Sequence, residues 1–181
     1  MKELQVITGC MFAGKSTELI RRLESHNEKF LLVKPKLDNR DKGDIIVTHS
    51  GIKIKAKRVR DLSDIFDTIA GVKVLGIDEA QFFDNKILDD LMYLRKCNIK
   101  IILAGLEKDY LDNFFGSMKE IIKISDSVTR LKASCTRCTN SATHSYRKTK
   151  GSNNQFLIGD KKSYEALCAE CYQKTIKIDG K

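Results

Sequence analysis

A loop from Gly9 to Ser16 carries the clearest chemical pattern in this sequence. It reads GCMFAGKS and matches GxxxxGK followed by Ser or Thr at every fixed position. In such a loop, glycines let backbone N–H groups turn inward around a nucleotide phosphate, the lysine reaches the β and γ oxygens, and the hydroxyl is a ligand of Mg²⁺. The sequence therefore predicts a site for a nucleoside triphosphate and Mg²⁺ at Gly9, Cys10, Met11, Phe12, Ala13, Gly14, Lys15 and Ser16. A chance glycine-rich turn is disfavoured, because a strand-like segment precedes the loop and a helix-like segment follows it.

Two adjacent carboxylates, Asp78 and Glu79, follow an apolar, strand-like segment at 72–77. In an open parallel sheet, ligands bind at the carboxyl ends of the strands, so this pair is expected beside the phosphate loop. Asp78 is predicted to hold Mg²⁺ or its waters, and Glu79 could accept a proton from a substrate hydroxyl. The alternative is that both simply begin a helix as acidic residues.

Four of the six cysteines form two CxxC pairs, Cys135 with Cys138 and Cys168 with Cys171. Four thiolates in this arrangement predict a closed, tetrahedral, structural zinc site, which would give the enclosed loop a fixed base. Disulfides and a catalytic zinc are the less favoured alternatives. Of the other two cysteines, Cys97 is expected to be a small buried residue at a helix end, and the backbone of Cys10 is expected to matter more than its thiol.

The elements that must position these residues follow from hydrophobic periodicity. Strands are predicted at 4–8, 30–33, 72–77, 99–104 and 128–132, and helices over 16–27, 61–70 and 86–96. Residues 36–60 predict a mobile loop and a short hairpin over the active site. The first two strands are expected to be parallel neighbours, joined by a right-handed crossover. The predicted fold class is α/β: a P-loop, RecA-like parallel sheet flanked by helices.

Composition sets the class of molecule. The 181 residues carry a net charge of +9 and are 41% hydrophobic, which favours one globular core. Because the αβ rhythm stops near Ala133, we expect a nucleotide-binding domain at 1–132 and a zinc ribbon at 133–181. The positive charge suits nucleic acid or nucleotides, but scattered lysines and arginines favour an ordinary solvated surface. No apolar run reaches membrane-spanning length and the start resembles no signal peptide, so a cytoplasmic location is expected.

Several motifs together carry a family resemblance. The segments GCMFAGKSTEL, KPKLDNR and IDEAQFF, and then paired CxxC motifs enclosing IGDKKSY, occur in this order. The chain thereby resembles the zinc-containing, cellular-type (type II) thymidine kinases. The resemblance implies that Glu79 is the catalytic base, that Asp38 and Arg40 face the triphosphate and its metal, and that Gln81 completes the nucleotide site. At Phe114 and Asp160 the chain departs from the family pattern.

The same resemblance implies an acceptor site. In these kinases a lasso loop, here carried by the zinc ribbon, folds over the nucleoside base and binds it largely through backbone groups. The substrate-binding residues implied by position are Phe82, Phe115, Ser145, Gln155, Phe156, Leu157, Ile158, Gly159 and Tyr164.

The leading functional hypothesis is ATP-dependent phosphorylation of thymidine, and of deoxyuridine, to the 5′-monophosphate in nucleotide salvage. It involves ATP, Mg²⁺ and structural Zn²⁺, with neither nucleic acid nor membrane as a partner, and the resemblance implies a homotetramer. The alternatives are a nucleic-acid-stimulated P-loop ATPase with a zinc ribbon and a regulatory nucleotide-binding module. A helicase-type ATPase is disfavoured because the chain has no room for a second such domain.

Overall fold

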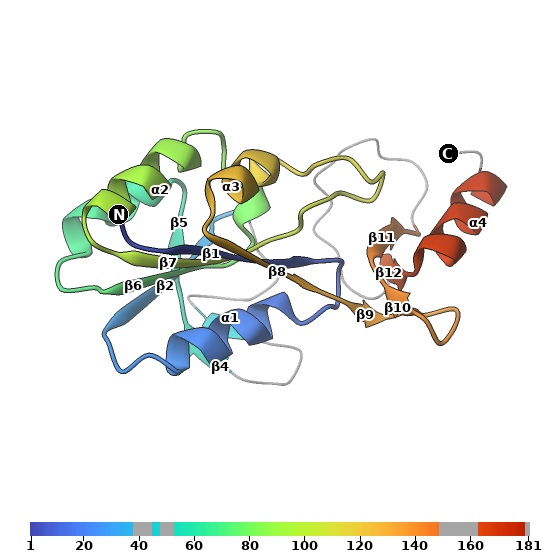
Figure 1. Cartoon of the computed structure of the whole chain (residues 1–181), viewed down its shortest axis with the longest axis horizontal. Coiled ribbons are helices and arrows are strands. Elements are labelled where there is room, and N and C mark those ends of the chain that lie inside the picture. Colours follow the sequence, from blue (N-terminus) through green and yellow to red (C-terminus); the bar gives the residue numbers. More distant parts are fainter. Residues whose placement is uncertain (38–44, 48–52, 149–162, 180–181) are drawn as a thin grey trace.

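A six-stranded parallel sheet forms the centre of the molecule (Figure 1). The computed structural model describes residues 1–37, 45–47, 53–148 and 163–179. The sheet strands are β1 (Leu4–Gly9), β2 (Phe30–Pro35), β5 (Lys57–Val59), β6 (Val74–Ile77), β7 (Lys100–Ala104) and β8 (Ser127–Leu131). Their order is β5-β2-β6-β7-β1-β8, and every adjacent pair is parallel. The predicted α/β class with a parallel sheet is confirmed.

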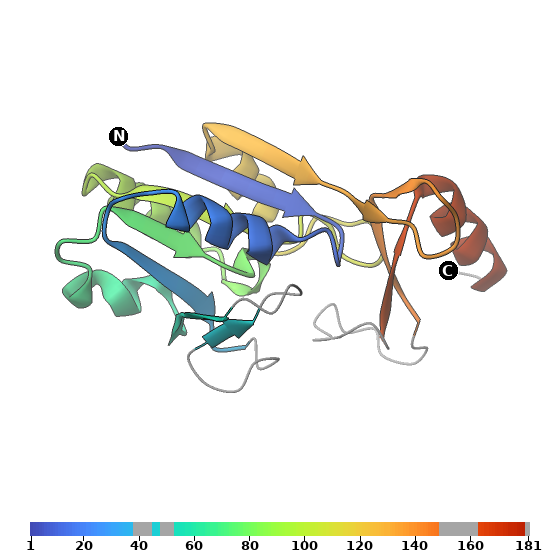
Figure 2. The same cartoon turned by 90° about the horizontal axis from the view of Figure 1, so that it is seen from below.

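Helices cover both faces of this sheet (Figures 1 and 2). One face carries α1 (Lys15–Glu24), and the other carries the 3-10 helix η1 (Leu62–Thr68), α2 (Ile87–Lys96) and α3 (Met118–Ile124). A short 3-10 turn, η2 (Ala80–Phe82), follows β6. The apolar stripe of α1, Leu19, Ile20 and Leu23, is fully buried against the sheet, as its helical spacing requires. None of the helices in the described ranges combines the length and apolarity needed to cross a bilayer.

The expected pairing of the first two strands is wrong. β1 lies between β7 and β8, whereas β2 lies between β5 and β6. The buried stripe of α1 belongs to one apolar cluster with residues of β1, β7, β6 and β2, and after the helix the chain re-enters the sheet beyond β6. Strands β1 and β2 point the same way, but β6 and β7 separate them.

The segment between β2 and η1 holds the predicted hairpin, formed by β3 (Ile45–Val47) and β4 (Lys53–Lys55) in antiparallel pairing. Its predicted position over the active site stays a prediction. Immediately afterwards, β5 joins the edge of the main sheet beside β2, whereas only a loop and a short hairpin were predicted for residues 36–60. The helix predicted at 61–70 is the 3-10 helix η1 (Leu62–Thr68), which begins with a capping box between Asp61 and Asp64.

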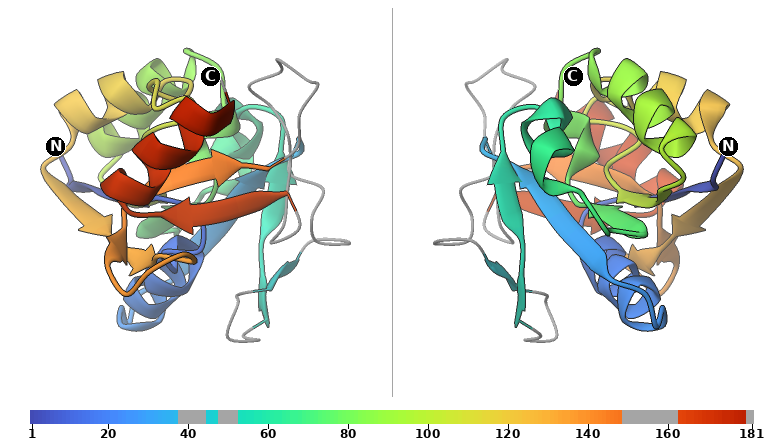
Figure 3. Two further views of the ribbon diagram at one scale, coloured as in Figure 1. Left: turned by 90° about the vertical axis from the view of Figure 1, so that its right-hand side faces the viewer. Right: turned by 90° about the vertical axis from the view of Figure 1, so that its left-hand side faces the viewer.

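The last described residues, 133–148 and 163–179, form a small body at the carboxyl end of the central strands, which we term the C-terminal ribbon (Figures 1 and 3). It contains the antiparallel pair β9 (Ala133–Ser134) and β10 (Ser141–Ala142) and the antiparallel pair β11 (His144–Arg147) and β12 (Tyr164–Leu167). Helix α4 (Ala169–Asp179) packs on β11 and β12.

Candidate active site

Two glycines shape the loop between β1 and α1. Gly9 has φ +148°, and a Cβ there would lie 2.3 Å from the carbonyl oxygen of Leu131, so no side chain fits. Gly14 has φ +81°, and apart from its immediate chain neighbours no described atom lies within 4 Å of the position its Cβ would take. Gly14 thus serves the left-handed turn that starts α1 and leaves open the space in front of the helix N-terminus, where N–H groups lack intrahelical acceptors.

The polar side chains of the loop have defined partners. The ammonium of Lys15 donates to the carbonyl oxygen of Cys10 at 2.9 Å. The hydroxyl of Ser16 donates to Oδ1 of Asp78 at 3.1 Å, which brings the end of β6 to the start of α1. A hydroxyl and a carboxylate oxygen in contact are the hard ligands that Mg²⁺ prefers, so this pair fits the metal predicted for it.

Glu79 occupies a strained backbone conformation next to this pair. Its φ and ψ are 53° and 43°, the left-handed region that non-glycine residues seldom adopt, and its side chain is buried. The side-chain amide of Gln81 donates to Oε2 of Glu79, while the amide oxygen of Gln81 accepts the N–H of Leu106 at 2.9 Å. Gln81 therefore orients the carboxylate and ties it to the segment after β7.

Two of the predicted substrate-binding residues, Phe82 and Phe115, lie together and form an apolar surface. The rings of Phe82 and Phe115 meet edge to face, with centroids 5.6 Å apart. The turn after Phe115 depends on Gly116, which has φ +52° and whose Cβ would lie 2.4 Å from the carbonyl oxygen of Gln81. The close approach of Gly116 to the backbone of Gln81 thus fixes how the segment that bears Glu79 packs against the loop that bears Phe115.

Of the predicted residues on the C-terminal ribbon, Tyr164 begins β12. It pairs with Arg147 across β11 and β12. Burial raises the pKa of the Tyr164 hydroxyl, and the nearby Arg147 opposes that rise. The guanidinium carbon of Arg147 lies 4.4 Å from the centroid of the Tyr110 ring. Ser145 instead contacts the phosphate loop: its Oγ accepts the N–H of Met11 at 3.0 Å.

Two further residues near the site, Arg147 and Tyr110, carry no motif in the sequence. Arg147 is only 1% exposed, although nothing in the segment HSYR marks its arginine as buried. Tyr110 lies in a loop without periodicity, whose turn is built around Asp109: the Asp109 carboxylate accepts the N–H groups of Leu111 and Asn113 at 2.8 and 3.0 Å. An Asx-type turn of this kind was the one local signal available in that loop.

Seven predicted residues lie outside the described residues: Asp38, Arg40, Gln155, Phe156, Leu157, Ile158 and Gly159. Their roles stay predictions.

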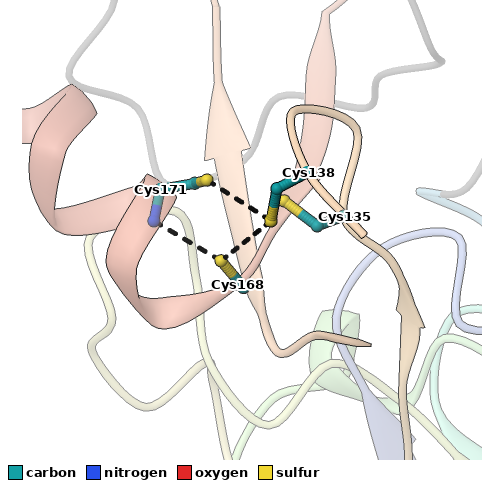
Figure 4. Close-up of side chains that lie close together, drawn as sticks. All are labelled: Cys135, Cys138, Cys168 and Cys171. Carbon is teal, nitrogen blue, oxygen red and sulfur yellow. Dashed lines mark hydrogen bonds between the residues drawn. The ribbon is translucent and has the colours of Figure 1, made fainter. Parts of the chain in front are cut away.

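The four paired cysteines come together at one point of the C-terminal ribbon (Figure 4). Their sulfurs all lie within 4.8 Å of one another, and Cys138 Sγ is 3.6 Å from Cys168 Sγ and 3.7 Å from Cys171 Sγ. A tetrahedral site with Zn–S bonds of about 2.3 Å requires sulfurs about 3.8 Å apart, whereas a disulfide requires about 2.05 Å. Burial would raise the pKa of Cys135, but backbone N–H groups of Cys168 and Arg137 bring it to about 6, whereas hydrogen bonding with Cys168 and Cys138 raises the pKa of Cys171 to about 12. The cluster fits a zinc ribbon.

One of the two expectations for the remaining cysteines needs correction: Cys97 follows the end of helix α2, but it is exposed. The backbone of Cys10 accepts the Lys15 ammonium, and its buried thiol also has a partner, because it donates to the carbonyl oxygen of Ala142 at 3.4 Å. Burial raises the pKa of the Cys10 thiol, which keeps its proton available for this bond.

A parallel α/β sheet with a phosphate loop, a strand-end Asp-Glu pair and a C-terminal cluster of four cysteines defines the class: a P-loop nucleotide-binding protein with a zinc ribbon. The sequence profile described as "Thymidine kinase" matches residues 2–172. The chain therefore belongs to the thymidine kinase family and is an enzyme of that family.

Three similar proteins align with this chain over nearly its whole length. The chain is 39% identical over 187 residues to "Thymidine kinase" of Mycoplasma mobile, covering 98% of this chain and 92% of that protein. It is 36% identical over 180 residues to "Thymidine kinase" of Bacteroides thetaiotaomicron, covering 98% and 90%. It is 35% identical over 179 residues to "Thymidine kinase" of Bacteroides fragilis, covering 97% and 89%.

Proposed function

We propose that this chain transfers the γ-phosphoryl group of ATP to the 5′-hydroxyl of thymidine, and of deoxyuridine, in nucleotide salvage. The observation that carries the proposal is the contact between Ser16 and Asp78 at 3.1 Å, which joins the phosphate loop to the strand end that bears Glu79. Family membership and the relatives' names support thymidine as the acceptor.

The chain's own residues divide the chemistry between them. The N–H groups at the start of α1 and the Lys15 ammonium bind the β- and γ-phosphates and balance charge on the moving phosphoryl group. Mg²⁺, held through Ser16 and Asp78, supplies further charge neutralisation when bound. Glu79 takes the proton from the nucleoside 5′-hydroxyl. The hydroxyl oxygen bonds to the γ-phosphorus as ADP leaves. Gln81 keeps the Glu79 carboxylate in position for that transfer.

The acceptor side of the proposal rests on the two segments that flank the carboxylates. The edge-to-face pair of Phe82 and Phe115 provides an apolar wall for a flat base. We assign nucleotide binding to residues 1–132 and acceptor binding mainly to 133–181, with Tyr164 and residues 155–159 over the base and Asp38 and Arg40 at the triphosphate. The four cysteines hold structural Zn²⁺ at the foot of that segment. A cytoplasmic homotetramer completes the proposal, and size-exclusion chromatography with light scattering tests the assembly.

The test is conversion of labelled thymidine to its monophosphate by zinc-loaded protein with Mg·ATP. We expect product with the unaltered protein, a loss of about 100-fold or more in turnover with Glu79→Gln, and near-normal triphosphate binding in that variant. Glu120→Gln, an exposed carboxylate on α3, is the matched control. A folded, zinc-loaded protein that makes no product, or that hydrolyses ATP only when single-stranded DNA is added, would refute the proposal.

A further inference from the structure

The first three residues of the phosphate loop all lie against the C-terminal ribbon or the strand that leads into it. Gly9 faces the carbonyl of Leu131, the last residue of β8. The Cys10 thiol donates to Ala142 of β10, and the N–H of Met11 donates to the Ser145 hydroxyl of β11. The half of the loop nearest β1 is thus built partly by residues more than 120 positions away along the chain.

Ser145 is held firmly enough to act as a fixed support. It is 6% exposed and pairs with Ala166 in the middle of the β11–β12 ladder. Around it, one apolar cluster joins Cys10 to the buried residues of the ribbon, and Phe12 and Ala13 pack against the same cluster. The side chain of a buried residue on a packed strand is already confined. The hydrogen bond from Met11 to Ser145 therefore orders the loop backbone, because the serine is held in place by its own strand.

The decisive detail is that one peptide group makes two of these bonds. The peptide between Cys10 and Met11 donates its N–H to Ser145 Oγ at 3.0 Å, and its carbonyl oxygen accepts the Lys15 ammonium at 2.9 Å. A trans peptide is planar, with its N–H and C=O pointing in opposite directions. Fixing the N–H on the ribbon therefore fixes the direction of the carbonyl that holds Lys15.

We propose that Ser145 is a positioning residue for Lys15, acting through the Cys10–Met11 peptide. The ammonium has three donors, so Lys15 can keep its bond to Cys10 while it reaches phosphate oxygens. Without the serine hydroxyl, the peptide loses its anchor, its plane can rotate, and the lysine loses the carbonyl that directs it toward the phosphates. This inference rests on the proposed function only in assigning Lys15 to the triphosphate, and it differs from the nucleoside-pocket role that family resemblance implies for Ser145.

The experiment measures triphosphate affinity with no nucleoside present, by titrating zinc-loaded protein and Mg²⁺ with a fluorescent ATP analogue. We expect Ser145→Ala to raise Kd about three- to tenfold, the loss of one buried hydrogen bond. Ser145→Thr keeps the hydroxyl and should stay within about twofold of the unaltered protein. Ser141→Ala, an exposed serine on β10, should not change Kd. Amide exchange in residues 9–16 should accelerate in Ser145→Ala, with zinc content unchanged.

Two results would overturn the proposal. One is an unchanged triphosphate Kd in Ser145→Ala with a raised KM for thymidine, because that profile assigns Ser145 to the nucleoside pocket alone. The other is an equal loss in Ser145→Thr and Ser145→Ala, because the hydroxyl would then not be the active feature. The titration contains no acceptor, so a protein that fails to phosphorylate thymidine refutes the proposed function and leaves the role of Ser145 to be decided by Kd and amide exchange.

Discussion

Gly116 shows how a single residue sets the distance between two parts of the site. It combines φ +52° with a backbone oxygen 2.4 Å from where its Cβ would be, and it follows the aromatic wall residue Phe115. Gly71 also has a positive φ, +77°, but the nearest described atom to its Cβ position is the end of the Lys29 side chain at 4.0 Å. A side chain at Gly71 would meet backbone strain alone, whereas a side chain at Gly116 would meet both strain and a steric clash.

We expect Gly116→Ala to lower the free energy of unfolding by about 2–4 kcal/mol and to raise KM for thymidine, because strain and overlap act together. Gly71→Ala carries strain alone and should cost about 1 kcal/mol with unchanged KM. Urea unfolding and steady-state kinetics measure both. Equal destabilisation by the two substitutions would show that the contact with Gln81 does not constrain the loop.

Arg147 permits a second prediction at this scale. Its guanidinium lies over the ring of Tyr110, and it pairs with Tyr164, a residue proposed to bind the nucleoside. Lysine keeps the charge but not the flat stacking surface, so Arg147→Lys should raise KM for thymidine about fivefold or more while triphosphate Kd stays constant. Arg137→Lys is the control, since Arg137 also lies over a ring, that of Tyr146, but its side chain is 41% exposed. A raised triphosphate Kd in Arg147→Lys would contradict the assignment.

At the scale of elements, α1 is tied to the sheet by charge as well as by its apolar stripe. Arg22 donates to Glu18 on the same helix, to Gln5 on β1 and to Thr129 on β8, at 2.8, 3.1 and 2.8 Å. Hydrogen bonding from Arg21, and then from Arg22, lowers the pKa of Glu18 from 4.5 to about 2 despite some burial. The helix that starts at the phosphate loop is thereby linked to both strands at that edge.

The sign of the pH effect follows from this shift. A carboxylate whose folded pKa is below its unfolded value stabilises the fold fully above about pH 4.5, and the stabilisation is lost as pH falls toward 2. We therefore expect Glu18→Gln to be less stable than the unaltered protein at pH 7, with the difference disappearing near pH 2. Glu24→Gln, exposed at the end of the same helix, is the control. A difference that does not change with pH would assign the effect to packing instead of charge.

The elements that sequence predicted are those whose pattern is local. The strand at 99–104 and the helix at 86–96 follow from their own periodicity, and the structure has them at Lys100–Ala104 and Ile87–Lys96. Strand order is not local: whether β1 lies beside β2 depends on how the Leu19 and Leu23 face of α1 crosses the sheet. The prediction therefore failed at the pairing of strands, although it was correct for the strands themselves.

The candidate site divides in the same way. The contact between Ser16 and Asp78 follows from two motifs and one rule about strand ends. The bond from Met11 to Ser145, by contrast, joins residues 134 positions apart and depends on how the C-terminal ribbon docks. Nothing in either segment indicates that pairing, because a serine in an alternating strand is as compatible with solvent as with a backbone N–H.

At the scale of the whole molecule, the two ends of the chain share one apolar cluster. Cys10 of the phosphate loop packs with Cys135 and Cys168, two of the proposed zinc ligands. A metal that organises the ribbon therefore also supports the phosphate loop, so loss of the metal should weaken nucleotide binding.

We expect Cys168→Ser to lose zinc, to melt at a lower temperature and to bind the ATP analogue at least about tenfold more weakly. Cys97→Ser, an exposed cysteine outside the cluster, should match the unaltered protein in all three measurements. Metal analysis, thermal unfolding and fluorescence titration provide the readouts. Zinc loss with unchanged triphosphate binding would show that the ribbon and the loop are energetically independent.

The place of β1 between β7 and β8 also governs the order in which the chain can assemble. The first strand made has no neighbour until residues 100–104 and 127–131 exist, and the loop after it gains its last supports only with residues 142 and 145. During synthesis, a growing chain thus carries an unpaired, apolar strand for most of its length, the kind of edge that pairs with other chains. Folding of the nucleotide site is accordingly a late, long-range event, and fragments ending before β8 should aggregate rather than bind nucleotide.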